Sequence, residues 1–141
     1  MTIRGISLSE TETIILPIDD PNNPTKWKIG VIDSLIMAEI QDLITIFEPD
    51  ISGDRSAPAK TKLCINLVRV EAARYGLKGW ENYVDSTGIQ TPFRTEKRHV
   101  GGKTVDAVAD ELLRTIPFDI VSALGERILN KNKFLEEEAK N

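Results

Sequence analysis

The stretch RYGLKGWENYVDSTGIQTPF, residues 74–93, contains four of the chain's eight aromatic side chains within twenty residues that glycines interrupt. Two segments of it, WENYV and IQTPF, alternate side chains in the pattern of short β-strands. Between them, DSTG ends in Gly88, which can adopt the positive φ that tight turns require. The stretch therefore predicts a β-hairpin in which residues 80–84 pair with residues 89–93.

A first hairpin is predicted nearer the N-terminus, after an arm of irregular structure at residues 1–10. The segments ETIILPI and KWKIGVI alternate apolar and polar residues, and the proline-containing DDPNNPT between them is typical of a turn. This alternation predicts one apolar face on each strand, formed by Ile14, Leu16 and Ile18 on the first and by Trp27, Ile29 and Val31 on the second.

Helical spacing of apolar residues predicts the remaining elements. One amphipathic helix is expected over residues 34–47, ended by Glu48-Pro49, and a second over 61–75, with Gly76 as its C-terminal cap. In the second helix a shared face is expected for Leu63, Cys64, Leu67, Val68, Glu71 and Tyr75. Beyond the second hairpin, residues 94–103 are expected to be a loop. Helices are then predicted over 105–117 and, after Pro117, over 118–132.

These elements predict a single small α+β domain at residues 11–132, in which two β-hairpins pack with four to five helices. A chain of 141 residues is long enough to bury one sizeable core. The domain carries a polar loop at residues 48–60, where we expect the greatest mobility. Residues 133–141 are predicted to form a short C-terminal helix or tail.

Composition indicates a soluble protein of a reducing compartment. No apolar run approaches the roughly 20 residues that a membrane helix needs. The N-terminal MTIRGISLSETET lacks the basic start and apolar core of a signal peptide. Cys64 is the only cysteine and cannot form an internal disulfide. We therefore expect a cytoplasmic protein without a membrane segment.

Charge is distributed unevenly along the chain. Residues 1–50 carry a formal net charge of −6, residues 51–103 carry +5 and residues 104–141 carry −3, which sum to the overall −4. A basic middle between acidic ends indicates either an anionic partner or parts of one domain that complement each other. The second interpretation is favoured, because the bases are spread over fifty residues of an acidic protein, unlike most nucleic-acid binders.

Reactive centres are hard to find in the sequence. With one histidine, His99, and one cysteine, the chain alone cannot supply a His/Cys metal site, and no calcium loop is evident. RHVGGKT matches only the end of a phosphate-binding loop, since Lys97 stands where the first glycine should be. A Gly-Gly loop that leads into a helix is the favoured interpretation. We therefore expect no catalytic residue, no metal and no cofactor.

A protein-binding surface is the remaining hypothesis, placed from Arg69 to Trp80 together with the apolar stripe of the first helix. The candidate contact residues are Arg69, Arg74, Tyr75, Lys78 and Trp80. Arg69 and Arg74 fall about 140° apart around a helix and make no continuous basic stripe. Trp80 and Tyr83 are expected on opposite faces of a strand, with Trp80 as a core anchor.

The chain resembles the small tail assembly chaperones of tailed bacteriophages. The resemblance lies in RYGLKGWENYVDSTGIQTPF and in the later IPFDIVSALGERILNKNKFLEEEAKN, and it covers about the last seventy residues. KWKIGVIDS also looks like phage proteins of this kind. The motifs that carry it are structural rather than catalytic.

This resemblance implies a non-enzymatic protein, made in a bacterial host's cytoplasm, that binds the helical tape-measure protein or other tail proteins while the tail assembles. It also implies that the protein can form a homo-oligomer and is absent from the finished particle. One alternative is a structural virion component, such as a connector or tail-tube subunit. A nucleic-acid-binding accessory protein or an enzyme has only the basic middle and the broken phosphate loop in its favour.

Overall fold

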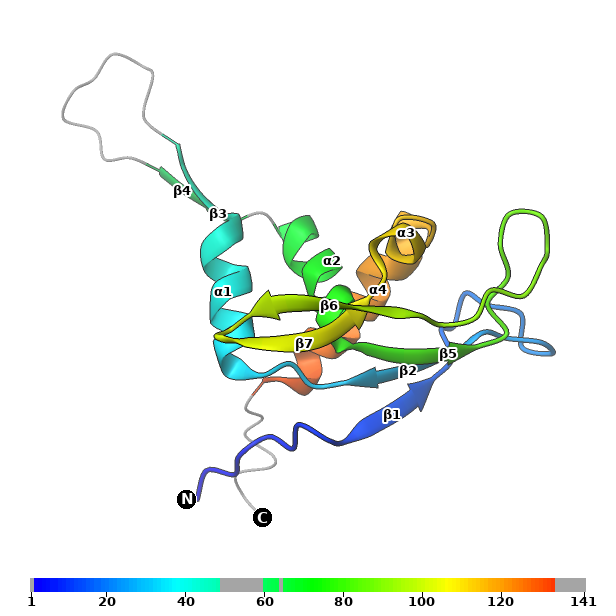
Figure 1. Cartoon of the computed structure of the whole chain (residues 1–141), viewed down its shortest axis with the longest axis horizontal. Coiled ribbons are helices and arrows are strands. Elements are labelled where there is room, and N and C mark those ends of the chain that lie inside the picture. The colour runs from blue at the N-terminus through cyan, green and yellow to red at the C-terminus, as the bar shows by residue number, and fades with distance from the viewer. Residues whose placement is uncertain (1, 49–59, 64, 134–141) are drawn as a thin grey trace.

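A computed structural model of the chain describes residues 2–48, 60–63 and 65–133, with side chains described outside 43–48 and 60–63. It is the small α+β domain that the sequence predicts (Figure 1). The elements in chain order are β1 (Thr11–Ile14), β2 (Lys26–Gly30), α1 (Ser34–Ile44), β3 (Thr45–Glu48), β4 (Lys60–Leu63), α2 (Ile65–Gly76), β5 (Leu77–Glu81), β6 (Thr95–Val100), β7 (Lys103–Val108), α3 (Asp110–Leu113) and α4 (Phe118–Lys131).

The first predicted hairpin is confirmed, because β1 and β2 pair antiparallel with Ile14 opposite Trp27. Ile14 and Leu16 are buried as expected. Ile18 is not, and 76% of its surface is exposed. The strand alternation that would have turned Ile18 inward stops at Ile14, where β1 ends, and Pro17 lies in the loop that follows.

The second predicted hairpin is wrong in its pairing. β5 pairs antiparallel with β2 in a sheet of strand order β1-β2-β5, so that Trp80 lies opposite Trp27. Of the predicted partners, only an isolated bridge between Val84 and Gln90 forms. Pairing of β5 with β2 is favoured over the predicted pairing with residues 89–93 because it buries Leu77 and brings the two tryptophans together. The predicted turn is present, since the amide of Gly88, at φ 86°, donates to the carbonyl of Asp85.

Two predicted helices are shorter than expected, because strands take over their ends. α1 stops at Ile44, and residues 45–48 form β3 instead of a last helical turn. β3 pairs antiparallel with β4, which replaces the first residues of the expected helix over 61–75. Backbone pairing across this hairpin, from Thr45–Leu63 to Glu48–Lys60, compensates for the helical bonds that are lost. Residues 49–59 of the predicted loop, and Cys64, lie outside the described residues.

The largest correction concerns residues 94–108, which were predicted as a loop followed by a helix. They form the antiparallel hairpin β6–β7, and only Asp110–Leu113 is helical as α3. The two residues between the strands, Gly101 and Gly102, have φ values of 60° and 79°. A two-residue turn with two positive φ angles matches the twist of antiparallel strands, and glycine adopts it without strain.

The centre of the domain is a close crossing of α2 and α4. A Cβ atom added to Gly125 would lie 2.0 Å from the carbonyl oxygen of Arg69, and one added to Gly76 would lie 2.3 Å from Cγ2 of Ile128. Gly76 is the last residue of α2, as the prediction that it ends this helix requires, but its φ is not positive, and the absence of a side chain serves the packing against α4. On the same helix Leu67, which was expected on the apolar face, is 51% exposed in the first turn.

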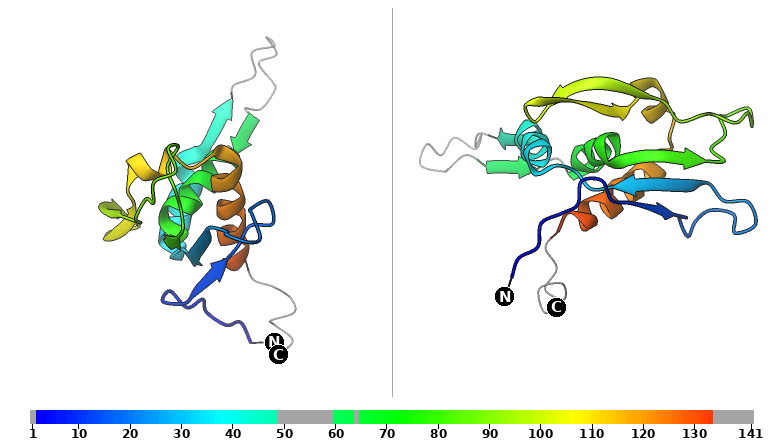
Figure 2. Two further views of the ribbon diagram at one scale, coloured as in Figure 1. Left: turned by 90° about the vertical axis from the view of Figure 1, so that its right-hand side faces the viewer. Right: turned by 60° about the horizontal axis from the view of Figure 1, so that its bottom comes forward.

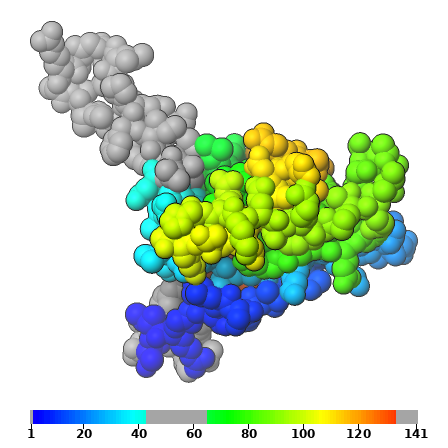
Figure 3. Space-filling view, viewed as in Figure 1, coloured from blue at the N-terminus to red at the C-terminus, as the bar shows by residue number. Residues whose placement is uncertain are grey.

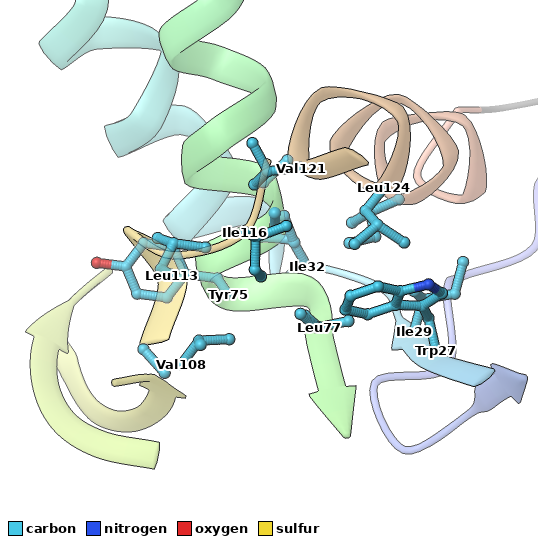
Figure 4. Packing of buried hydrophobic residues seen from close by; sticks show 14 of the residues in the cluster. Trp27, Ile29, Ile32, Tyr75, Leu77, Val108, Leu113, Ile116, Val121 and Leu124 are labelled. Atoms are coloured by element: carbon cyan, nitrogen blue, oxygen red, sulfur yellow. The ribbon is translucent and has the colours of Figure 1, made fainter. Parts of the chain in front are cut away.

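The predicted helix after Pro117 is confirmed as α4, and it supplies one wall of the core. Val121 lies beside α2, and Leu124 lies next to Trp27 and Ile29 of β2 (Figure 4). The hairpin β6–β7 covers the other side of α2 (Figure 2). Buried side chains of α2, α4, β2, β6 and β7 belong to one hydrophobic cluster, so these elements share a single core.

The end of α4 is attached to the end of β2 by the side chain of Asn132. Its Oδ1 accepts from the amide of Ile32 at 3.0 Å, and its Nδ2 donates to the carbonyl of the same residue at 2.5 Å. Close by, the ammonium of Lys131 lies 2.8 Å from a carboxylate oxygen of Glu12 in β1. Contacts between residues about one hundred positions apart thus close the domain. The expected helix or tail beyond Lys133 lies outside the described residues.

Candidate protein-binding surface

Arg74, one of the candidate contact residues, is built into an ion-pair network. Its side chain is only 11% exposed, and its guanidinium lies 2.8 Å from Asp110 Oδ1 and 3.1 Å from Glu71 Oε2. Asp110 also pairs with Arg114. These hydrogen bonds, first that of Arg74 and then that of Arg114, lower the pKa of Asp110 to about 2. Arg74 therefore joins α2 to α3, and little of it is available to a partner.

Tyr75 is engaged within the domain, whereas Lys78 is exposed and is anchored to the domain by one hydrogen bond. Tyr75 is buried, and its hydroxyl accepts a hydrogen bond from Nε of Arg98. The ammonium of Lys78 donates to the carbonyl of Tyr75 at 2.8 Å, and its stem passes over Gly30. Desolvation lowers the pKa of Lys78. A hollow of about 100 Å³ beside Lys78 is smaller than the cavities that hold organic ligands.

The rest of the predicted surface does not form one exposed patch. Arg69 is half-buried, and its backbone carbonyl lies under Gly125. The apolar stripe of α1 was expected to add to this surface, but its Ile36 and Ile40 are buried in the core. Of the five predicted contact residues, Trp80 is the one that lies next to a region with exposed apolar side chains.

Trp80 belongs to a cluster of four aromatic rings at one end of the three-stranded sheet. Its ring centroid lies 5.8 Å from that of Trp27, 4.9 Å from that of Tyr83 and 4.8 Å from that of Phe93. The prediction that Trp80 and Tyr83 point to opposite faces is therefore wrong. β5 ends at Glu81, and Asn82 adopts a φ of 61°, which turns the chain so that both rings meet.

Asn82 also joins the two loops that meet at this end, residues 15–25 and 81–93. Its side-chain amide donates to the backbone carbonyls of Asn23 and Pro24. The backbone carbonyl of Asn82 accepts from the hydroxyl of Thr25 at 2.8 Å. Asparagine is among the few residues that tolerate a positive φ. The residue that bends one loop thus also fixes its position against the other.

Internal hydrogen bonds hold the tip of each loop. In the second loop, Oδ1 of Asp85 accepts from the amides of Thr87 and Ile89 and from the hydroxyl of Thr87. In the first, Oδ2 of Asp19 accepts from the amide of Thr25 at 2.7 Å. The indole Nε1 of Trp80 donates to the carbonyl of Thr91 and so connects the second loop to the sheet. Both loops are therefore ordered before any partner arrives.

Four large apolar side chains of these ordered loops are exposed: Ile18 at 76%, Ile89 at 65%, Ile15 at 47% and Val84 at 41%. The two loops project at the same end of the molecule, green and blue at the right of the space-filling view (Figure 3). We call this surface the loop end, meaning residues 15–25 and 81–93. Sequence reasoning missed it because it assigned Ile18 and Ile89 to strands, although the flanking Pro17 and Gly88 are turn residues.

Four of the seven middle-segment bases whose side chains the structure describes pair with acids of the flanking segments. Lys103 lies 3.2 Å from Asp33, Arg74 contacts Asp110, and Arg94 pairs with Glu111. These contacts agree with the interpretation that separate parts of one domain complement each other. Gly102-Lys103-Thr104 leads into strand β7, so the expectation that this glycine loop leads into a helix is wrong.

The described residues show neither a metal site nor a membrane-spanning helix. No group of three or more His, Cys, Asp or Glu side chains suited to a metal ion occurs within residues 2–48, 60–63 and 65–133. In the same part of the chain, every helix is too short or too polar to cross a membrane. Comparisons with protein-family models, curated proteins and solved structures found no match.

Proposed function

We propose that this chain is a non-enzymatic tail assembly chaperone of a tailed bacteriophage, acting in the cytoplasm of the bacterial host. The observation that carries a protein-binding role is the loop end, where Ile18, Val84 and Ile89 project from loops that hydrogen bonds have already ordered. Exposed apolar side chains on a preformed scaffold suit a protein partner, because little conformational entropy is lost when they are covered.

The resemblance supplies the client, which would be the tape-measure protein. Part of the first segment that carries the resemblance, residues 80–93 of 74–93, forms the second loop of the loop end and its aromatic support. The motif and the proposed contact surface thus overlap in this loop. Arg69, Arg74, Tyr75 and Lys78 have a supporting role in this proposal, and Trp80 holds the second loop in place.

Co-expression with the proteins encoded beside it, followed by affinity capture and mass spectrometry of the complex and of purified particles, tests the proposal. We expect a tape-measure protein in the captured complex and no copy of this chain in mature particles. A fixed copy number in particles would contradict the chaperone role and support a structural virion component.

Substitutions at the loop end locate the contact. Ile18→Asp and Ile89→Asp change exposed side chains, so both variants should keep the wild-type melting temperature and lose client capture by about tenfold or more. Leu35→Asp is the matched control, because Leu35 is 68% exposed on α1, away from the loop end. Equal capture by all four proteins would show that the client binds elsewhere.

A further inference from the structure

The loop end is an acidic part of the described surface. Residues 15–25 and 81–93 contain Asp19, Asp20, Glu81 and Asp85 and no lysine, arginine or histidine, a formal charge of −4. The whole chain also carries −4. All residues outside these two loops therefore sum to zero, and the net charge of the protein is that of the loop end.

These carboxylates have no ion-pair partner within the described domain, although those of Asp19 and Asp85 accept hydrogen bonds inside their own loops. Asp20, Glu81 and Asp85 are exposed, and none of the four loop-end acids takes part in the ion pairs found among the described residues. By contrast, Asp33, Asp106 and Glu111 elsewhere each have a lysine or arginine partner. Hydrogen bonds from Thr87 and Ile89 lower the pKa of Asp85, so it stays ionised well below neutral pH.

We infer that the loop end binds a basic amphipathic helix, whose apolar stripe contacts Ile18, Val84 and Ile89 while lysine or arginine at its borders faces the carboxylates. This inference rests on the proposed function and adds the chemistry of the client's binding segment. Complementary charge around an apolar centre steers association and selects partners. A helix combines an apolar stripe and basic borders in one rigid element.

An extended strand fits this surface less well. Strand addition requires free backbone donors and acceptors at a sheet edge. In the second loop the amide of Thr91 donates to the carbonyl of Tyr83, and the amide of Asp85 donates to the carbonyl of Ile89. These backbone groups already have partners, which leaves the second loop with fewer free donors and acceptors for an added strand.

Two designed peptides of about 18 residues test the inference. Both have the same leucine stripe, and their polar positions are lysine in one and glutamate in the other. Titration of the full chain with each, by calorimetry in low salt, should show binding of the lysine peptide at least about tenfold tighter than that of the glutamate peptide, with the difference shrinking as salt is added. Absence of binding by either peptide, or equal binding by both, would overturn the inference.

Variants place the effect at the loop end. Asp20→Asn combined with Glu81→Gln should weaken the lysine peptide by about three- to tenfold, whereas Asp42→Asn combined with Glu126→Gln, a matched pair of exposed acids elsewhere, should leave its affinity unchanged. Equal losses in both pairs would mean non-specific attraction to an acidic protein and would refute the site.

The inference and the proposed function can fail separately. If Ile89→Asp abolishes client capture but the two peptides bind equally, the loop end is the contact surface and its charge has no part in choosing the partner. If the lysine peptide binds selectively but no tail protein is captured, the surface chemistry stands and the phage role is wrong.

Discussion

Gly125→Ala should destabilise the domain, although the same change in an exposed helix normally stabilises by about 1 kcal/mol. The added methyl group would lie 2.0 Å from the carbonyl oxygen of Arg69, and Cβ atoms essentially never come within 3.0 Å of such a neighbour. Because the obstacle is backbone, α4 must move away from α2 by about 1 Å.

The cost follows from the side chains that this movement loosens. Val121, Leu124 and Ile128 are at least 95% buried, and full burial of each contributes about 1.5 to 3 kcal/mol. A gap near 1 Å forfeits a quarter to a half of this attraction, or about 1 to 4.5 kcal/mol over the three. The gain in helix propensity offsets about 1 kcal/mol. From the middle of this range we expect a net loss of about 1 to 2 kcal/mol.

Urea unfolding followed by far-ultraviolet circular dichroism measures this difference, and thermal melts should show a drop of roughly 3 to 8 °C. Glu126→Ala is the control, since it changes the next, exposed residue of the same helix and should alter stability by less than about 0.5 kcal/mol. A Gly125→Ala protein as stable as the wild type, or more stable, would refute the close crossing of the two helices.

Two further predictions concern the aromatic cluster and the ion-pair network. Trp80→Ala should lower the free energy of unfolding by about 3 to 5 kcal/mol, because it removes the ring that joins β5 to Phe93 and the hydrogen bond to Thr91. An unchanged melting temperature with lost client binding would make Trp80 a contact residue instead. Asp110 has a folded pKa of about 2, below its ordinary 3.8, so its stabilising effect is present above pH 3.8 and is lost as the pH falls toward 2. Asp110→Asn should therefore reduce the acid sensitivity of the melting temperature in that window, and an unaltered acid profile would contradict the pairing with Arg74.

The sequence predicts elements well where local pattern and tertiary packing agree. Pro117 followed by apolar residues at helical spacing gives α4, and alternation around a proline-rich turn gives β1 and β2. Turn chemistry was equally informative at Asp85 to Gly88. In each of these places a single local conformation satisfies both the backbone and the core.

Prediction fails where one pattern fits two structures. Val105, Val108 and Leu112 have helical spacing, but Val105 also belongs to the strand alternation of β7, and only the positive φ angles at Gly101 and Gly102 select the hairpin. Two adjacent glycines between alternating segments are a known hairpin signal and could have identified it. The pairing of β5 with β2 depends on long-range contacts that no window of sequence contains.

The candidate site was hidden for a related reason. Its residues come from two loops more than fifty positions apart, and the contact between them depends on Asn82, whose positive φ cannot be read from an asparagine alone. The charged and aromatic residues between Arg69 and Trp80 instead favoured a surface on and just after α2. Once α2 is seen at the centre of the core, the exposed apolar side chains nearest to Trp80 are those of the two loops (Figure 1).

The attachment of Asn132 to Ile32 has a consequence for the order of events during synthesis. β1 and β2 are made first, yet the face that carries Trp27 and Ile29 is covered by α4, which the ribosome adds about one hundred residues later. The apolar face of the sheet therefore remains exposed to water until nearly the whole domain has been synthesised. Because so many stabilising contacts join distant positions, the chain gains little from folding early, and acquisition of the native state should be late and cooperative.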